Sequence, residues 1–591
     1  MFNITSETKN YLQKKTIANS LFLILAIGLA FLSLTDCNRA SADNHEATGA
    51  FKYREIFLPE GIGKYAEALG LNTLDEDWGI WGHNLARVLP DEHSQSVFAK
   101  VNGNTLKKQF CFSSNHLFGY IEEFIDSKYD EEENIRFAII PNDNDIVCLC
   151  EKCVAAGNSK GNASPAVNKL VRRLAARFPS HIFYTSDYKT TRSLPNDTMP
   201  SNTGVLLSAI NFPLSAKSTP EEARFINRIQ AWKRTTPRVL VWDYINNFDD
   251  YFTPYPAMGA MQRRLQGYRD NKVTAVFLNG SGNDISAFSR LRTETLAALT
   301  EDPDIDWRIH LMEKAQELYP VSGDLIADFI IYQEDEVERN GVVLPLYDGV
   351  AKARGSYLPE DKFVEFHDNL IKLRNKTQGA ERNDIDLLLG QLAFTRLELN
   401  RIQGTPRNSD MYIRDLERLA SKGHLSYNES GWTIDSYIKD YKYLLNHFGE
   451  SQGNKLRGER LVALTPLDPD YTDLSILTDG VLGIPSNYHN GNLITSPEVF
   501  TQIAVPNRQN LKKLRVWMSY NPAYRVKLPE SVTLKSGGRV IKSIEPSYPA
   551  DLSGHSMVEF DIPAGVDGSL SLVFTKVEDT HSMAIEEIEG Y

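Results

Sequence analysis

The chain has 591 residues and a formal net charge of −13, and its hydrophobic (42%) and charged (24%) fractions are those of an ordinary globular protein. Its length exceeds what one hydrophobic core normally serves, so we expect about two to four domains. Because no long block of Lys and Arg offsets the acidic balance, a nucleic-acid backbone is excluded as a partner. No period of about 20 to 50 residues recurs, which excludes a solenoid or a propeller.

The first 37 residues have the pattern of a lipoprotein-type signal peptide. Three lysines precede an apolar run from Leu21 to Leu34, which is about as long as a signal-peptide core and too short to span a bilayer comfortably. The run leads into Leu34-Thr35-Asp36-Cys37, which resembles a lipobox. We therefore predict that residues 1–37 are the signal, that Cys37 is acylated, and that this lipid anchor holds the exported protein at the outer membrane or cell surface. Secretion into the periplasm and an uncleaved anchor are the alternatives.

From residue 51 to about 305, short apolar runs alternate with helix-like stretches, which is typical of strand–helix units and a parallel sheet. Eight strands can be counted, the number that closes a barrel, so we predict a (β/α)8 barrel of the TIM type. An open doubly wound sheet is the alternative, but no glycine-rich phosphate loop follows an early strand. The strands are Phe51–Phe57, Trp78–Asn84, Gln109–Ser114, Ile135–Pro141, His181–Asp187, Gly204–Asn211, Arg238–Tyr244 and Val273–Asn279. The helices between them include Ser164–Phe178, Pro220–Arg234, Ala257–Asp270 and Asp284–Thr300.

The pattern changes twice after the barrel. Residues 306–450 contain long amphipathic segments without convincing strands, such as Ile309–Leu318, Glu360–Leu373 and Arg382–Leu399, and predict a helical domain. Residues 455–578 return to β-branched alternation with frequent Gly, Pro and Asn turns, and predict a β-sandwich of carbohydrate-binding type. The last 15 residues are acidic, and we expect them to lack regular structure.

The active site of a βα barrel lies at the C-terminal ends of its strands, where this sequence is rich in polar and aromatic residues. Carboxylates gathered with aromatics and amides, without a nucleotide loop or a Ser-His-Asp order, favour glycosidic bond cleavage by paired acid and base groups. Each candidate also has a structural alternative: a helix N-cap or barrel core position in general, a turn or calcium loop for Asn142–Asp145, and a satisfied structural histidine for His83. The candidates are the carboxylates Glu55, Asp143 and Asp243, and the ligand-binding residues Arg54, His83, Asn142, Trp242 and Tyr244.

Four cysteines form a second group of candidate functional residues. Cys111 lies near the end of the third predicted strand, and Cys148, Cys150 and Cys153 lie in the loop after the fourth. Adjacent strands bring all four together, and Cys-x-Cys-x-x-Cys plus one more thiol fits a closed tetrahedral zinc site. One or two disulfides are an equal alternative, favoured by an oxidising location. Either arrangement braces the loop that carries Asp143 and takes no part in the chemistry.

Several motifs occur together and in order: Tyr53-Arg54-Glu55, Trp81-Gly82-His83-Asn84 with Leu89-Pro90, Ile140-Pro141-Asn142-Asp143 before Cys148-Leu149-Cys150-Glu151-Lys152-Cys153, and Val241-Trp242-Asp243-Tyr244 with Tyr255-Pro256. Over residues 51 to about 310 the chain thereby resembles a bacterial family long catalogued as a domain of unknown function. That family is now associated with endo-β-N-acetylglucosaminidases acting on N-glycans. Leu477-Thr478-Asp479-Gly480 and Ser486-Asn487-Tyr488-His489-Asn490-Gly491 resemble a galactose-binding-like sandwich.

The resemblance implies a retaining, substrate-assisted reaction, in which the 2-acetamido carbonyl attacks the anomeric carbon while the protein supplies an acid. One carboxyl group then protonates the leaving oxygen and another orients the acetamide. Asp143 and Asp243 are the expected pair, with Glu55 as a third candidate, because strands four and seven face each other across a barrel. Between Trp242 and Tyr244, Asp243 is expected to stay protonated and act as the acid, whereas Asp143 stays ionised. The expected partner is a glycan, and no cofactor is expected for catalysis.

One departure from the family pattern favours a different function. Relatives are expected to end strand eight in an acidic Phe-Glu-Gln-Gly-like string, whereas this chain has Phe277-Leu278-Asn279-Gly280. If that acid is required, the protein is a catalytically inactive, glycan-binding surface lipoprotein. An adhesin or scaffold without a glycan pocket is the third hypothesis.

Overall fold

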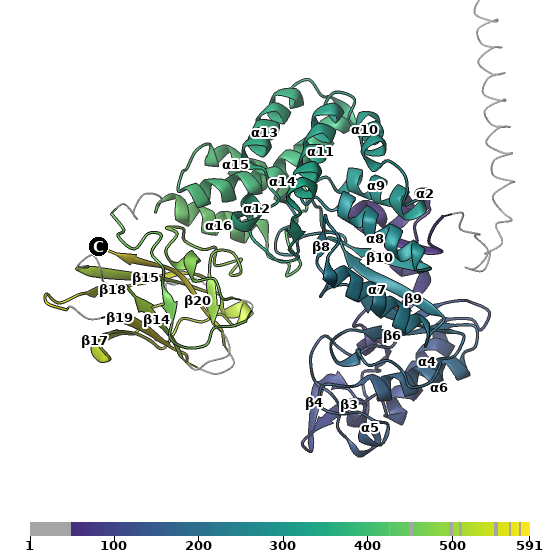
Figure 1. Cartoon of the computed structure of the whole chain (residues 1–591). Helices are drawn as coiled ribbons and strands as arrows, with labels where there is room; N and C mark the ends of the chain where they lie inside the picture. Colours follow the sequence, from purple (N-terminus) through teal and green to yellow (C-terminus); the bar gives the residue numbers. More distant parts are fainter. Residues whose placement is uncertain are drawn as a thin grey trace, which may run out of the picture.

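The computed structural model describes residues 49–424, 426–447, 453–469, 471–495, 500–506, 511–548, 553–566, 569–577 and 581–591. The predicted signal and Cys37 lie outside these residues. Within the described part, no helix has the length and apolar character needed to cross a membrane. Figure 1 shows three regions in chain order: a strand–helix region, a helical region, and a β-sandwich that ends the chain.

A seven-stranded, wholly parallel sheet forms the centre of the strand–helix region. Its strands are β1 (Tyr53–Phe57), β2 (Trp78–Ile80), β5 (Arg136–Ala138), β6 (Ile182–Asp187), β7 (Thr203–Ser208), β9 (Arg238–Tyr244) and β10 (Ala275–Asn279). Their order is β1-β10-β9-β7-β6-β5-β2, so β1 and β2 stand at the two edges and do not pair. The predicted parallel strand–helix units are confirmed, but the predicted closed (β/α)8 barrel is wrong: the curled sheet is an open barrel.

The predicted third strand, Gln109–Ser114, belongs to a different structure. Its first residues end β4 (Asn104–Phe110), which pairs antiparallel with β3 (Phe98–Val101) in a separate hairpin. Asn102 and Gly103 have φ values of 51° and 81°, and positive φ at both positions is typical of a two-residue hairpin turn. Most of β4 is exposed, unlike a central parallel strand, which is buried on both faces. β2 therefore pairs directly with β5.

Side chains connect β1 and β2 where backbone pairing is absent. The indole N–H of Trp78 donates to the Tyr53 hydroxyl (2.8 Å), and that hydroxyl donates to Glu55. The guanidinium of Arg136 lies 5.0 Å from the centre of the Tyr53 ring and forms an ion pair with Asp77 (2.8 Å). The open side of the barrel is thus filled by a polar and aromatic cluster.

Successive side chains along each strand point to opposite faces of the sheet, so the sheet has an inner and an outer face. The inner face buries a cluster that includes Tyr184, Leu206 and Phe277, with Trp242 packed against it. The outer face buries residues such as Ile56 and Leu278 against the helices. The parity of a residue along its strand therefore decides whether its side chain meets the barrel interior or the helices.

Helices pack around the outer face of the sheet (Figure 1). Three of the four predicted helices agree within one residue at each end, whereas α9 begins five residues later than predicted, at Ser289 instead of Asp284. The helices of this region are α2 (Gly63–Ala68), α3 (Leu74–Asp77), α4 (Asn115–Lys128), α5 (Glu151–Ala155), α6 (Ser164–Arg177), α7 (Pro220–Lys233), α8 (Met258–Asp270) and α9 (Ser289–Glu301).

The helical region shares one hydrophobic core with the outer face of the barrel. A single buried cluster runs from Ile56 and Leu278 on the sheet to Leu392 and Tyr441 in the helices, and β8 (Leu214–Ser215) pairs with β11 (Val343–Leu344) between the two regions. The predicted helices are confirmed, but they do not form an independent core. They are α10 (Trp307–Leu318), α11 (Gly323–Asn340), α12 (Val350–Arg354), α13 (Glu360–Arg374), α14 (Gly379–Gln403), α15 (Ser409–Ser421) and α16 (Ile434–Leu445).

The C-terminal region is a two-sheet sandwich with its own core. One sheet contains β12 (Val462–Ala463), β14 (Phe500–Val505), β19 (Leu570–Thr575), β16 (Ser531–Ser536) and β17 (Arg539–Ile544), and the other β13 (Leu493–Thr495), β20 (Met583–Gly590), β15 (Lys513–Tyr520) and β18 (Gly554–Asp561). The expectation of an unstructured acidic end is wrong, because β20 is a buried strand between β13 and β15. Its acids have partners: Glu586 accepts from Ser519 (2.6 Å) and Glu589 from Trp517 (3.1 Å).

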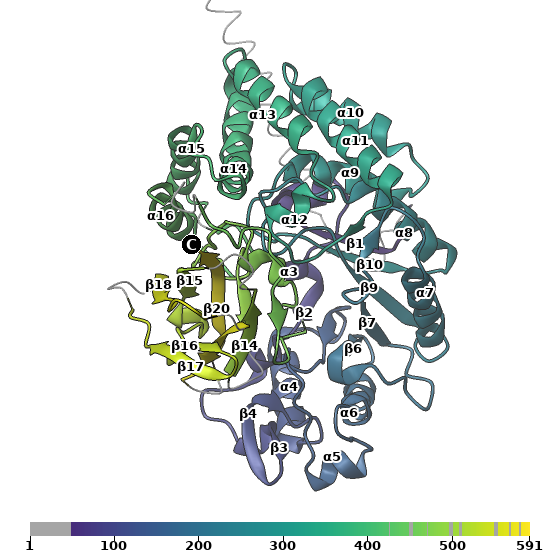
Figure 2. The same cartoon turned by 60° about the vertical axis from the view of Figure 1, so that its left-hand side comes forward.

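The segment before β13 fastens the sandwich to the rest of the chain, and Figure 2 shows the sandwich next to α16. Arg401 and Glu398 on α14 form a buried ion pair (2.7 Å). Asn490 donates to Glu398 (2.6 Å) and accepts from Arg401 (3.0 Å). His489 lies 3.0 Å from Asp249 in the loop after β9. These residues of the galactose-binding-like motif therefore serve in docking the sandwich.

Candidate active site

A pocket of about 160 Å³ opens at the C-terminal ends of β6, β7, β9 and β10, where βα barrels carry their active sites. Tyr347 and Glu429 come from the helical region, and the other lining residues come from the barrel. The lining includes the aromatic residues Tyr188, Trp242, Tyr244 and Tyr347, the ionisable residues His83, Asp143 and Glu429, and the polar residues Ser186, Ser208 and Asn279.

The parity of β9 builds the aromatic wall of the pocket. Trp242 and Tyr244 are two residues apart and so face the interior together. Trp242 stacks on Trp81, with ring centres 4.9 Å apart and planes inclined by 13°. The Tyr244 hydroxyl lies 3.2 Å from Ser208 Oγ on β7. Flat rings beside hydroxyl groups suit a ligand with apolar faces and a polar rim.

Asp143 lies at the rim with its side chain 53% exposed. Lys189 Nζ is 2.7 Å from its Oδ1, and the Tyr188 hydroxyl also bonds to it. Partial burial acts to raise the pKa of Asp143, but Lys189, the nearby His83 and Tyr188 outweigh it, so that pKa lies below its usual value. Asp143 is therefore ionised at neutral pH.

β4 holds the loop that carries Asp143. The buried Gln109 accepts from the backbone N–H of Asn142 (3.0 Å) and donates to the Asn142 carbonyl (3.0 Å). The side chains of Asn142 and Asn144 each donate to the carbonyl of Lys108 (3.0 Å). Asn142 therefore braces the loop and does not line the pocket, contrary to its predicted role in binding substrate.

Glu429 reaches the rim from the loop between α15 and α16. The Tyr347 hydroxyl donates to Glu429 Oε2 (2.8 Å). In the loop after β9, the Phe248 carbonyl accepts from the Glu429 backbone N–H (3.0 Å), and the Phe248 N–H donates to the Leu346 carbonyl (2.7 Å). This barrel loop therefore positions both residues of the helical region.

The two carboxyl groups of the pocket differ in their electrostatics. Although Glu429 is exposed at the rim, loss of surrounding water raises its pKa; the hydrogen bond from Tyr347 opposes that rise, and the charges of Asp249 and Asp143 add to it. The pKa of Glu429 thus lies above its usual value, whereas the pKa of Asp143 lies below. Divergent pKa values within one pocket distinguish an acid from a base.

His83 contacts the same loop and lines the pocket. Its Nδ1 is 2.6 Å from the Pro141 carbonyl, which can only accept, so Nδ1 donates this hydrogen bond. The ring centre lies 6.0 Å from that of Tyr188. His83 therefore lines the pocket, and its role in binding ligand stays a prediction.

The structure places Asp243 outside the pocket. As the residue between Trp242 and Tyr244, it faces the helices. Its Oδ1 lies 2.7 Å from Arg264 Nη1, its Oδ2 accepts from the Tyr268 hydroxyl (2.5 Å), and it is 1% exposed. The expectation that Asp243 flanks a bound sugar is wrong, because its carboxylate is on the outer face of the sheet.

Arg54 and Glu55 also lie away from the pocket. Arg54 is on the outer face, where it donates to the Gly70 carbonyl (3.1 Å) and lies 3.5 Å from Glu301. Glu55 is inside the barrel but buried at the gap between β1 and β2, where desolvation raises its pKa to about 8. Both residues were predicted to take part in the site, but neither lines the pocket.

The residue that favoured an inactive protein also faces away. Leu278 is fully buried in the cluster between sheet and helices, and in the register of the sheet it pairs with Asp243 and Ile56. Asn279, the next residue, lines the pocket. An acid at position 278 would therefore not reach the pocket, and the leucine gives no reason to exclude catalysis.

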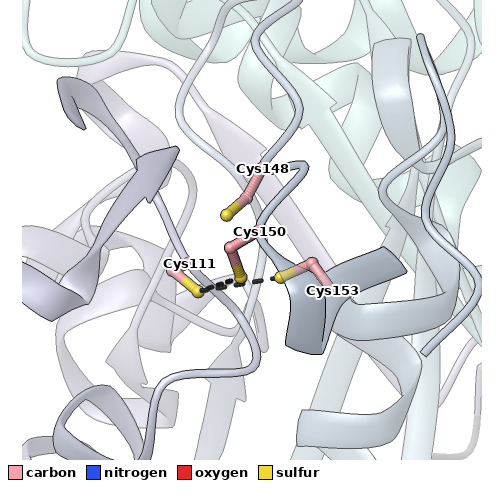
Figure 3. A group of neighbouring side chains, drawn as sticks. All are labelled: Cys111, Cys148, Cys150 and Cys153. Atoms are coloured by element: carbon pink, nitrogen blue, oxygen red, sulfur yellow. Dashed lines mark hydrogen bonds between the residues drawn. The ribbon is translucent and has the colours of Figure 1, made fainter. Parts of the chain in front are cut away.

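The four cysteines lie together, as the sequence predicted. Figure 3 shows their sulfur atoms turned toward one another, with Cys111 following β4, Cys148 and Cys150 in the loop, and Cys153 on α5. All four Sγ atoms lie within 4.8 Å of one another, and Cys111 is 3.6 Å from Cys150 and 3.7 Å from Cys153. All four are free thiols in the structure.

Sequence reasoning missed Glu429, Tyr347 and Lys189, since it considered only residues at the ends of the strands. One signal for Glu429 was present: a polar turn between two helices. Asn428 accepts from the backbone N–H of Trp432 (3.0 Å), and Gly431 has a φ of 72°. A turn built this tightly can present the side chain at its tip in a fixed place.

Comparison with known families gives one match. Residues 39–330 match the model of DUF4838, a domain of unknown function. The DUF4838 match includes Asp143 and the four cysteines but ends before Tyr347 and Glu429. None of the curated proteins compared with the chain matches it.

Three solved structures resemble parts of the chain at low identity. BtGH115A, a GH115 4-O-methyl-α-glucuronidase with specificity for decorated arabinogalactans, is 12% identical over 81% of this chain and 67% of its own, with a TM-score of 0.34. A GH138 enzyme targeting pectin rhamnogalacturonan II is 7% identical over 91% of this chain and 84% of its own, with a TM-score of 0.29. A Streptococcus pneumoniae fucose-binding module is 14% identical over 23% of this chain and 94% of its own, with a TM-score of 0.18.

Proposed function

We propose that the protein is a glycoside hydrolase that cleaves glycans containing N-acetylglucosamine. The observation that carries this proposal is the pair Asp143 and Glu429, which line one pocket beside Trp242 and whose pKa values shift in opposite directions. Hydrolysis of a glycosidic bond needs one protonated and one ionised carboxyl group. This pair replaces the pair Asp143 and Asp243 expected from the sequence.

The proposed reaction is retaining and assisted by the substrate. Protonated Glu429 donates its proton to the glycosidic oxygen as the bond from that oxygen to the anomeric carbon breaks, and the substrate's 2-acetamido oxygen forms a new bond to the same carbon. Ionised Asp143 accepts a hydrogen bond from the acetamido N–H, which gains positive charge in this step. Water then attacks the anomeric carbon and returns a proton to Glu429, and the acetamide is released.

The size of the pocket indicates how much of the glycan it holds. At about 160 Å³, it is smaller than the roughly 300–1,000 Å³ typical of pockets for drug-sized ligands. One sugar unit therefore enters between Trp242 and Asp143, while the rest of the glycan lies across the rim. The endo-acting character is proposed from the resemblance in sequence and not from the pocket, in which His83 and Tyr244 contact hydroxyl groups of the enclosed sugar.

We also propose that this reaction takes place outside the cytoplasm. The charged and apolar N-terminal pattern that leads to Cys37 supports export with a lipid anchor. Such a protein meets glycans at the cell surface, where an anchored enzyme gains access to polymers too large to enter the cell.

The test is incubation of the purified chain with a panel of N-glycans and other glycans containing N-acetylglucosamine, with released products read by mass spectrometry. We expect Asp143→Asn and Glu429→Gln each to lower the rate by about 10²- to 10⁴-fold, with folding unchanged. Asp145→Asn is the matched control, because Asp145 is exposed two residues away and does not line the pocket.

Two outcomes would overturn the assignment. Near-normal rates in both variants would remove Asp143 and Glu429 as the reacting pair. Binding without any cleavage, abolished by a Trp242→Ala change, would identify the protein as a glycan-binding surface protein instead.

A further inference from the structure

The cysteine cluster has the dimensions of a metal site. A tetrahedral zinc–thiolate centre with Zn–S bonds of about 2.3 Å places its sulfur atoms about 3.8 Å apart. The Sγ distances from Cys111 to Cys150 and Cys153 are 3.6 and 3.7 Å (Figure 3). A disulfide requires about 2.05 Å, so the sulfur atoms are spaced for sharing a central ion.

The surroundings also suit thiolates bound to a metal. Cys111, Cys148 and Cys153 are at most 5% exposed, and the backbone N–H of Lys100 on β3 donates to Cys148 Sγ (3.2 Å). Such a hydrogen bond stabilises negative charge on sulfur. Among the described residues, no histidine or carboxylate belongs to the group. Four thiolates complete a tetrahedron and leave no open position, which is typical of a structural site.

We propose that Cys111, Cys148, Cys150 and Cys153 bind one zinc ion that fastens the β3–β4 hairpin to the loop carrying Asp143. Binding forms four Zn–S bonds and releases the protons of the four thiols to solvent. The ion has no role in the reaction, since the site is closed.

The topology of the sheet shows why the hairpin and the Asp143 loop need an additional link. The hairpin takes the place of a barrel strand but makes no backbone pairs with the seven-stranded sheet. Asp143 lies five residues before Cys148, and Gln109, which holds Asn142, lies two residues before Cys111. The ion and the Gln109 amide therefore restrain the same loop from two points. The effect on Asp143 rests on the proposed function, whereas the zinc site does not.

The first experiment measures metal in the full-length chain purified without chelator. We expect elemental mass spectrometry to find one zinc ion per chain. We also expect four thiols to be protected from alkylation until the zinc is removed. Cys153→Ser should lose the zinc and lower the melting temperature. Cys37→Ser is the matched control, because it removes the one cysteine outside the cluster and should leave the zinc in place.

If Cys153→Ser does not fold, titration of the wild-type protein with an organomercurial decides the question, because modification of four thiols should release one zinc. Iron in place of zinc, four thiols that are alkylated at once with no metal, or a mass lower by two or four hydrogens from disulfides would each overturn the proposal. Zinc without any glycan cleavage would leave the site standing and remove only the proposed hydrolase function.

Discussion

Replacing Asp243 by asparagine tests whether this carboxylate is structural, as its geometry indicates. Asp243 accepts from Arg264 (2.7 Å), Tyr268 (2.5 Å) and the backbone N–H of Tyr244 (2.9 Å), and both Asp243 and Arg264 are almost fully buried. The substitution keeps the size of the side chain but leaves the Arg264 charge without its partner. Removing one member of a buried ion pair costs about 3–5 kcal/mol.

Asp143→Asn makes the same chemical change at an exposed ion pair, where the contribution to stability is about 0.2–1 kcal/mol. The two variants should therefore differ by at least about 2 kcal/mol, which is roughly thirtyfold in the unfolding equilibrium. Urea unfolding followed by tryptophan fluorescence measures the difference. Replacing Asp243 and Arg264 together by leucine and methionine should recover much of the loss, since apolar replacements of buried pairs are often neutral.

If Asp243→Asn unfolds at the same urea concentration as Asp143→Asn yet abolishes glycan cleavage, Asp243 acts in the reaction and its buried contacts with Arg264 are not its main role. Equal stability of the two variants without an effect on cleavage would also contradict the structural assignment, because it would show that the ion pair contributes little.

Three further predictions concern separate parts of the molecule. Lys189→Met should raise the pKa of Asp143 toward its usual value, because the ion pair that lowers this pKa is lost, and should move the acid limb of the pH–rate profile upward, whereas Lys189→Arg should not. Folding raises the pKa of Glu55 from 4.5 to about 8, so the free energy of unfolding falls as pH rises from about 4.5 to about 8, where the carboxyl is ionised in the unfolded chain but keeps its proton when buried. Glu55→Gln should remove this fall, which is measured as the change in the urea midpoint across that pH range. Asn490→Leu should destabilise the chain by about 1–3 kcal/mol, because Arg401 loses a buried partner; an unchanged unfolding midpoint would show that Asn490 does not fasten the sandwich.

Much of the fold was predictable because hydrophobic periodicity is a local property. It located the seven parallel strands and four of the helices around them, and it indicated a β-rich region after the helices. The third predicted strand failed because Phe110 ends the hairpin strand β4 and Phe112 follows it, and both are buried in a core shared with Phe98 instead of pairing within the seven-stranded sheet. The Asn102-Gly103 turn was the signal for that hairpin. The acidic end of the chain was misjudged because composition hid a strand whose acids are paired inside the sandwich.

The candidate site was predicted in part, and its errors follow from parity. Trp242 and Tyr244 were expected to face the sugar. Because neighbouring residues on a strand point to opposite faces, Asp243 between them must then point away from the sugar. The same rule excludes Arg54 once Glu55 faces inward. Glu429 was beyond such reasoning, because only the packing of a distant turn against the loop after β9 brings it to the pocket.

The continuous core between barrel and helices has a consequence for how such chains can be recombined. Under the proposed function, the proton donor Glu429 comes from the helical region and its partner Asp143 from the barrel. A gene fusion that exchanges the helices therefore disrupts the packing of the shared core and also removes Glu429. The sandwich has a separate core and contacts its neighbours through polar pairs and a few aromatic contacts, such as Tyr443 with His555 and Trp432 with Tyr524, so it is the part that evolution or engineering can exchange most easily. A boundary drawn at the end of the DUF4838 match, at residue 330, would separate Tyr347 and Glu429 from the rest of the pocket.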